Sequence, residues 1–175
     1  MKKKKFLFIN GSASGNSSNE KLIAYLIQSL DGCETKVFNG LKNLPHFDPA
    51  FSTENTPVEI TDIRTDIKTA DGIIICTPEY IFSIPSSLKN LLEWCVATTV
   101  FSEKPVGIIT ASASGEKGHA ELQLIIKTLG GVFHNENLLL VQGIKGKINM
   151  ERNIDEELKE KLQGFIYSFI KSCKS

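Results

Sequence analysis

Short apolar runs alternate along this chain with longer segments in which apolar residues recur at helical spacing. Five runs have the length of β-strands, and three of them, FLFIN, GIIIC and VGIIT, are almost wholly apolar instead of alternating with polar residues. A strand has this composition when both of its faces are covered. We therefore expect strands at residues 5–10, 34–39, 72–76, 105–110 and 137–141.

The segments between and after these runs carry apolar residues three or four positions apart, which places them on one side of an α-helix. The five apolar stripes begin at Leu22, Ile60, Leu88, Leu122 and Leu158. Strand and helix thus alternate five times. This order predicts an α/β fold, a doubly wound five-stranded parallel sheet with helices on both faces, formed by residues 1–175 as a single domain.

Composition narrows the class of protein. The chain has 175 residues, of which 41% are apolar, so it can bury a substantial core. Lys plus Arg and Asp plus Glu both number 20, so there is no basic surplus for binding nucleic acid. No apolar stretch approaches the roughly 18 residues of a membrane span. We expect a cytoplasmic protein without a membrane or nucleic-acid partner.

The four cysteines do not form a recognisable site. Cys33, Cys76, Cys95 and Cys173 are widely spaced, with no C-x-x-C pair and no histidine at ligand spacing. This pattern favours neither a disulfide framework nor a metal centre. Cys76 and Cys95 lie within apolar periodicity and are expected in the core.

Ligands of such sheets bind beyond the carboxyl ends of the strands. Three loops qualify: GSASGNSSN, TPEYIFSIPS and ASASGEKG, which follow the first, third and fourth expected strands. The tetrapeptide Ser-Ala-Ser-Gly occurs in both the first and the last of them. A separate segment, residues 41–57, is rich in Pro, Asn and Phe and is expected to be a long surface loop.

The first loop has the composition of a phosphate site. Its small residues permit close approach of a ligand, and Ser17, Ser18 or Asn19 can cap the helix that follows. A helix N-terminus presents free N–H groups and about half a positive charge, and the hydroxyls of Ser12 and Ser14 add further donors. The G-x-G-x-x-G, P-loop and nucleophile-elbow patterns are absent. The alternative is a serine-rich turn that only caps the helix.

The second loop is stiff, because Pro78 fixes its own φ angle and lacks an N–H. The amides of Glu79, Tyr80 and Ile81 are therefore expected to face a ligand. Tyr80 and Phe82 offer flat apolar surface, which suits a heteroaromatic ring with carbonyl and ring-nitrogen acceptors. In the alternative, Tyr80 and Phe82 belong to the core or to a subunit contact.

Together, GSASGNSSN, PEYIFSIPSSLKNLLEW and ASASGEKGHAELQL resemble the NADPH-dependent FMN reductase family, a flavodoxin-like group that includes quinone, azo-dye and chromate reductases. The resemblance extends from Phe6 to about Val141. Its most specific part is Pro-Glu-Tyr at 78–80, followed at the family's spacing by Ser83, Pro85, Leu88, Lys89, Asn90 and Trp94.

This resemblance implies a cofactor and residues that bind it. FMN would be the cofactor, with NADPH or NADH as co-substrate. Ser12, Ser17 and Asn19 would hold the FMN phosphate. Pro78, Glu79, Tyr80 and Ile81 would line the isoalloxazine ring, and Ser112 and Gly115 would close its other side. The Glu79 carboxylate is expected to point away from the ring or into a hydrogen bond.

Three positions depart from the family's pattern. Ser14 stands where the family often has arginine, Ile81 where it often has asparagine, and Ser86 where it often has glycine. The first change removes a cation from the phosphate loop, which weakens FMN binding or transfers the charge to a lysine elsewhere. The second leaves only the Ile81 amide to contact the flavin.

The resemblance implies an NAD(P)H-dependent oxidoreductase that passes hydride through FMN to a small acceptor such as free flavin, a quinone or an azo compound. No residue is predicted to be catalytic, because the flavin supplies the chemistry. One alternative is a flavodoxin-type electron carrier reduced by a partner protein. Another is a binding module that has lost the ligand. His46 and His119 are expected at the surface.

Family members generally form dimers or tetramers. We expect a homodimer or homotetramer, with the helix after Pro85 at the subunit contact. Leu88, Leu92, Trp94 and Val96 are expected to give that helix its apolar surface.

Overall fold

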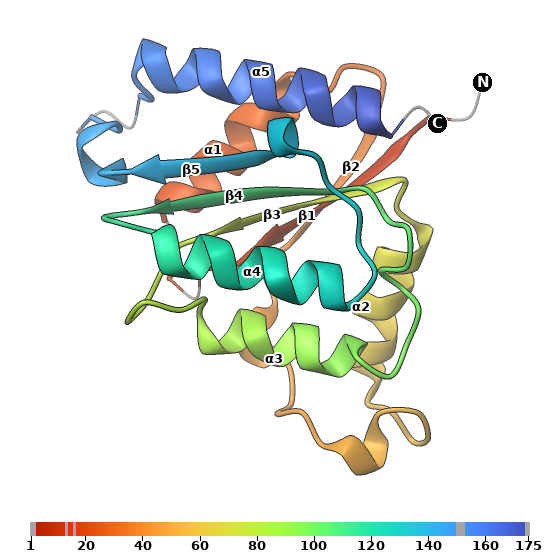
Figure 1. Cartoon of the computed structure of the whole chain (residues 1–175). Helices are drawn as coiled ribbons and strands as arrows, with labels where there is room; N and C mark the ends of the chain where they lie inside the picture. Colours follow the sequence, from red (N-terminus) through yellow and green to blue (C-terminus); the bar gives the residue numbers. More distant parts are fainter. Residues whose placement is uncertain (1–2, 13, 16, 150–152, 174–175) are drawn as a thin grey trace.

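The computed structural model describes residues 3–12, 14–15, 17–149 and 153–173. Its sheet has five parallel strands in the order β2-β1-β3-β4-β5 (Figure 1). The strands are β1 (Lys5–Asn10), β2 (Glu34–Phe38), β3 (Gly72–Thr77), β4 (Val106–Ser112) and β5 (Leu138–Gln142). This is the doubly wound, flavodoxin-like topology expected from the sequence. The chain reverses its direction across the sheet between β1 and β3, where such folds bind ligands.

Helices cover both faces of the sheet (Figure 1). One face carries α1 (Ser18–Gln28) and α5 (Glu156–Ser172), and the other carries α2 (Val58–Thr69), α3 (Ser86–Cys95) and α4 (Glu116–Thr128). Each face has its own apolar core, and the two cores meet only through the strands. β3 is buried along its whole length, as its uninterrupted apolar sequence predicts.

The segment between β2 and α2 is irregular, as expected, and contains only the short 3-10 turns η1 (Leu41–Asn43) and η2 (Pro49–Phe51). It packs against α3. The Pro45 carbonyl accepts hydrogen bonds from Trp94 Nε1 at 2.8 Å and from Asn90 Nδ2 at 2.9 Å. The Phe47 ring meets the Trp94 ring edge-on, with centroids 5.2 Å apart. The loop therefore covers one side of α3.

The burial of α3, by this loop over Trp94 and by the apolar core around Leu88 and Leu92, corrects the expectation for its surface. Leu88, Leu92 and Trp94 are at most 1% exposed within the chain itself, so they do not form apolar surface for a partner. Only Val96, at 59%, is exposed. Pro85 is the N-cap of α3. None of the helices in the described residues is long and apolar enough to cross a membrane.

Candidate functional site

A cavity of about 530 Å³ lies at the carboxyl ends of the strands, a volume in the range of about 300–1,000 Å³ usual for ligand sites. These ends are on the left in Figure 1. The cavity brings together most of the predicted site residues: Ser12, Ser14, Ser17, Ser18, Asn19, Pro78, Tyr80 and Ser112. Its remaining walls are Ala111, Ala113 and the segment 143–146 after β5. Glu79, Ile81 and Gly115 do not line it.

The loop after β1 supplies hydroxyl groups and a helix N-terminus. Ser17 is the N-cap of α1, and its Oγ accepts the amide of Glu20 at 3.2 Å. Ser12 Oγ accepts the amide of Ser14 at 3.3 Å. Ala13 and Asn16 lie outside the described residues. Capping thus requires only Ser17, and Ser18 lines the cavity without being needed for it.

Asn19 is fixed from behind. It lies in the first turn of α1, is 3% exposed, and its Oδ1 accepts the Cys76 thiol at 3.1 Å. Burial raises the pKa of Cys76 well above its usual range, so the group is a neutral thiol and not a reactive thiolate. Cys76 therefore serves as a buried donor that orients Asn19.

The loop after β3 forms a tight two-residue turn. Tyr80 N donates to Ser83 O at 2.9 Å, and Ser83 N donates to Tyr80 O at 3.1 Å. The two central residues, Ile81 and Phe82, have φ angles of 49° and 59°. Such turns favour Asn and Gly, so an apolar pair held in this conformation is strained.

This turn corrects one expectation and removes one alternative. The Tyr80 amide is used inside the turn, so only the amides of Glu79 and Ile81 remain available to a ligand. Phe82 is 76% exposed and Ile81 94%, so within this chain neither belongs to the core. Both side chains stand in solvent next to Tyr80, which lines the cavity.

Two carboxylates fasten this turn to α4. The Glu79 carboxylate accepts the amides of Gly115 at 3.0 Å and Gly118 at 2.8 Å, at the positive end of the helix. In the opposite direction, Glu121 accepts Ser83 Oγ at 2.7 Å and the Ile84 amide at 3.0 Å. We call Glu79 and Glu121 the carboxylate clamp. The clamp draws the Glu79 charge into hydrogen bonds, as expected, and away from the cavity.

The loop after β4 is joined to the same turn, since Ser112 Oγ donates to the Glu79 carbonyl at 3.3 Å. Gly115 is buried, with φ 92°, and a Cβ there would lie 2.9 Å from Leu140 Cδ1. Its role is thus to let the chain turn into α4. The prediction that Gly115 lines the ligand site therefore does not match the cavity, whereas Ser112 does line it.

The expected surface position of His119 is wrong. His119 is half-buried, and its Nδ1 lies 2.8 Å from Thr110 Oγ1 on β4. Burial lowers the pKa of His119, so the ring is neutral near pH 7. His46 is exposed, as expected. Neither histidine lines the cavity.

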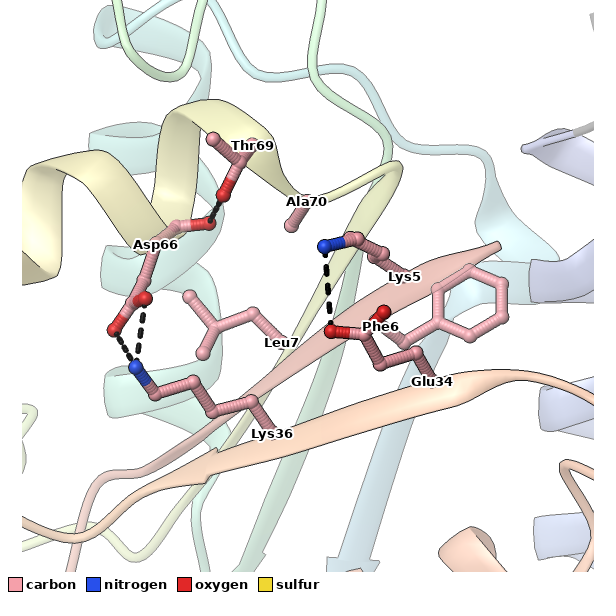
Figure 2. Close-up of a pocket in the computed structure, with 8 residues that line it drawn as sticks. All are labelled: Lys5, Phe6, Leu7, Glu34, Lys36, Asp66, Thr69 and Ala70. Atoms are coloured by element: carbon pink, nitrogen blue, oxygen red, sulfur yellow. Dashed lines mark hydrogen bonds and ion pairs between the residues drawn. The ribbon is translucent and has the colours of Figure 1, made fainter. Parts of the chain in front are cut away.

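A second, smaller cavity of about 190 Å³ lies at the other end of the sheet, beside the start of β1 (Figure 2). Its charged groups pair with each other: Lys5 Nζ is 3.3 Å from Glu34 Oε1, and Lys36 Nζ is 2.7 Å from Asp66 Oδ2. This cavity is at the amino ends of the strands, where doubly wound sheets do not bind their ligands. We do not assign it a function.

The sequence model for NADPH-dependent FMN reductases matches residues 4–143. The chain belongs to this family. Among individual members, an NADPH azoreductase of a Bacillus species is 24% identical over 98% of this chain and 91% of its own length. A quinone reductase of Escherichia coli is 26% identical over 78% of this chain and 77% of its own length.

Other relatives agree on the class of protein. The CrdA subunit of an NADH:(hydroxy)cinnamate reductase from Vibrio ruber is 33% identical over 71% of this chain, but this chain spans only 61% of that subunit. Among solved structures, the flavoenzyme FerB from Paracoccus denitrificans has a TM-score of 0.84 at 23% identity and covers 98% of this chain and 97% of FerB. That similarity shows the fold.

Membership of the FMN reductase family confirms the predicted class, an NAD(P)H-dependent FMN oxidoreductase, over an electron carrier. The cavity suits FMN. Hydroxyl donors and the α1 N-terminus match a phosphate, while Pro78, Tyr80 and Ile144 offer apolar wall to a ring.

The sequence reasoning missed the segment 143–146 after β5, which contributes Gly143, Ile144, Lys145 and Gly146 to the cavity. The sequence predicts ligand-binding loops only after the first, third and fourth strands. The missed signal was the topology itself, since in a parallel sheet the carboxyl end of β5 lies at the same edge as the others.

Ser17→Ala is expected to lower the free energy of unfolding by about 1 kcal/mol, because α1 loses its cap, and to weaken FMN binding. The matched control is Asp155→Ala, which removes the N-cap of α5, where Asp155 Oδ1 accepts the Leu158 amide at 2.7 Å. Asp155→Ala should lower the free energy of unfolding by a similar amount and leave FMN affinity unchanged. Urea unfolding and flavin titration of both variants measure this; equal FMN affinities would show that Ser17 is only a cap.

Proposed function

We propose that the cavity at the carboxyl ends of the strands holds FMN, with its phosphate at the loop after β1 and its ring beside Pro78 and Tyr80. The observation that carries the proposal is that one cavity is lined by serines of the first loop, by Pro78 and Tyr80 of the second loop and by Ser112. These are the three elements whose sequences resemble the family. Ser12, Ser17 and Asn19 would hold the phosphate, and Pro78 and Tyr80 would face the ring.

The chemistry that a bound FMN would supply is transfer of hydride and electrons between a nicotinamide and an acceptor. The protein's part is to bind the flavin, to orient it toward the nicotinamide and the acceptor, and to exclude competing reactions. The lining residues that the structure describes include no carboxylate, imidazole or thiol. None of these three groups is therefore positioned there as a general acid or base, and we assign proton exchange to solvent. The carboxylate clamp keeps the negative charge of Glu79 at the α4 N-terminus, so this charge would not repel negative charge on a flavin held in the cavity.

The acceptor that fits best is a small, flat, partly apolar molecule of the quinone or azo class. Tyr80, Ile81 and Phe82 form exposed apolar surface beside the cavity, with 44%, 94% and 76% of each residue accessible. The names of the E. coli quinone reductase and the Bacillus azoreductase support the same class. Free flavin, a larger flat acceptor, is the second candidate.

The test is the visible absorption spectrum of the chain after FMN addition and removal of free flavin, recorded without oxygen before and after NADPH or NADH. We expect retained flavin bands that bleach with at least one nicotinamide and return when a benzoquinone is added. Retained flavin that neither nicotinamide reduces would point to a carrier. No retained flavin would refute the proposed site.

We also propose that the protein is a homodimer in the cytoplasm. The four cysteines are free thiols, which suits a reducing compartment. The contact we propose is the groove between α3 and α4, where Val96 and Leu124 are 59% and 67% exposed. Lys89 and Glu93, which also line the groove, pair at 2.6 Å. An apolar patch with an internally neutralised pair can face its own copy across a two-fold axis.

Light scattering with size exclusion is expected to give twice the chain mass for the native protein and a monomer mass for Leu124→Asp. Val58→Asp is the control, because Val58 is 65% exposed on α2, away from the groove. A monomer in the native protein would refute the dimer. A dimer that survives Leu124→Asp would place the contact elsewhere.

A further inference from the structure

Lys145 is the one charged side chain among the described residues that line the cavity. It comes from the segment after β5, which no sequence motif marked. All other described lining residues are serine, asparagine, proline, tyrosine, alanine, glycine or isoleucine. The whole positive charge that side chains can offer a ligand there rests on this lysine.

The backbone of Lys145 is fixed at the cavity wall. Gly143 adopts φ 63°, and its amide donates to the Ala113 carbonyl at 3.1 Å, which ties the segment to the loop after β4. Ile144 is 6% exposed and is inserted into the core beneath α5. The 3-10 turn η4 (Ile144–Gly146) then directs the chain back, with the Lys147 amide donating to Ile144 O at 3.1 Å. The lysine head group remains exposed on a held backbone.

Lys145 has no protein counter-ion in the part of the chain that the structure describes. Its neighbour Lys147, by contrast, lies 3.9 Å from Glu157 Oε2. A cation that lines a cavity and has no carboxylate partner is suited to an anionic group of a ligand.

The loop after β1 lacks the charge that its ligand requires. Its described lining side chains, Ser12, Ser14, Ser17, Ser18 and Asn19, are all neutral. The α1 N-terminus supplies only about half a positive charge, whereas a phosphomonoester carries about −1.5 to −2 at neutral pH. Ser14 occupies the position where the family often has arginine, so the missing charge has to come from another element.

We propose that Lys145 supplies the positive charge for the FMN phosphate, in place of the arginine absent at position 14. The inference rests on the proposed function. Hydroxyls and amides of the first loop orient the phosphate, and Lys145, from the segment after β5 that lines the same cavity, neutralises it. A lysine acts here as a point charge on a flexible stem, so it needs no bidentate geometry.

The experiment compares FMN with riboflavin, which lacks the phosphate. The whole chain is freed of flavin, and flavin fluorescence is titrated with native protein and with Lys145→Ala, Lys145→Arg and Lys147→Ala. For Lys145→Ala we expect FMN affinity to fall about 10- to 100-fold, the usual effect of losing one charge-assisted hydrogen bond. Riboflavin affinity should be unchanged. Lys145→Arg should restore FMN binding, and Lys147→Ala should bind as the native protein does.

Salt gives a second measurement that does not depend on activity. FMN affinity of the native protein is expected to fall with ionic strength more steeply than that of Lys145→Ala, because the screened charge is gone in the variant. Equal salt slopes in the two proteins would contradict the proposal.

Three further results would overturn this inference and leave the proposed function intact. FMN affinity equal to native in Lys145→Ala would show that the lysine does not contact the phosphate. Equal losses for FMN and riboflavin would place it against the rest of the flavin. Unchanged flavin binding with a raised KM for NADPH but not NADH would assign it to the nicotinamide phosphate. A native protein that binds neither flavin would instead refute the proposed function, and this inference with it.

Discussion

Glu79→Ala is expected to weaken FMN binding at least about tenfold and to lower the thermal midpoint by several degrees. The Glu79 carboxylate accepts two amides at the start of α4, and losing one hydrogen bond to a charged group costs about 1.5–3 kcal/mol. For a chain of this size, each 1 kcal/mol lowers the midpoint by about 2–4 °C. FMN affinity falls because the loop that carries Pro78 and Tyr80, which line the cavity, is no longer held against α4. Thermal melts and flavin titration measure the two effects.

The control for this variant is Glu116→Ala. Glu116 is an exposed residue in the first turn of α4, the turn whose amides Glu79 accepts, and Glu116 Oε1 accepts a hydrogen bond from Gln142 Nε2 at 3.2 Å. The Glu116→Ala variant removes a negative charge from the helix N-terminus without opening the carboxylate clamp. Glu121→Gln tests the other half of the clamp, through Ser83 and Ile84. If Glu79→Ala and Glu116→Ala behave alike, the clamp does not position the flavin turn.

Gly11→Ala is expected to destabilise the fold by about 3 kcal/mol or more, the upper part of the range for overpacked sites. A Cβ at Gly11 would lie 2.4 Å from Thr77 Oγ1 and 2.5 Å from Thr77 Cβ. Thr77 is fully buried at the end of β3, so it cannot move aside. The clash separates the ends of β1 and β3, which begin the two principal loops of the cavity. FMN binding should therefore be lost together with stability.

The comparison for Gly11→Ala is Gly15→Ala in the same loop. A Cβ at Gly15 meets no described atom within 4 Å, so this variant should unfold close to the native midpoint. Urea unfolding without flavin separates the two. Native-like stability of Gly11→Ala would mean that the loop and β3 lie further apart than the structure shows.

The sheet could be predicted from the sequence because each of its central strands has a distinctive local composition. β1, β3 and β4 are covered on both faces, so each is a nearly unbroken apolar run. The exposed side of α3 could not be read in this way. Trp94 and Leu92 have the periodicity of a helix that is apolar on several sides. The cover over Trp94 comes from Pro45 and Phe47, about fifty residues earlier in the chain.

In the candidate site, too, some residues could be predicted from local sequence and others depend on the tertiary structure. The composition of the first loop identified its serines and Asn19 as lining residues, and the stiffness of Pro78 marked the second loop. The hydrogen bonds of the Glu79 carboxylate to the start of α4 and the position of Lys145 at the cavity both depend on which loops lie side by side in the fold. No spacing in the sequence contains that information, although strand order supplies it once the sheet is known.

The strained turn at Ile81 and Phe82 lowers the stability of the fold but keeps two apolar side chains exposed beside the cavity. Residues in the left-handed region cost about 1–3 kcal/mol each unless they are Gly, Asn or Asp. Asparagine, which the family often has at position 81, adopts this conformation readily. Isoleucine at position 81 therefore lowers the stability of the fold, and it also exposes an apolar side chain to water. Variants selected only for heat resistance would be expected to recover asparagine or glycine at 81 and 82, and to lose the apolar rim of the cavity in doing so.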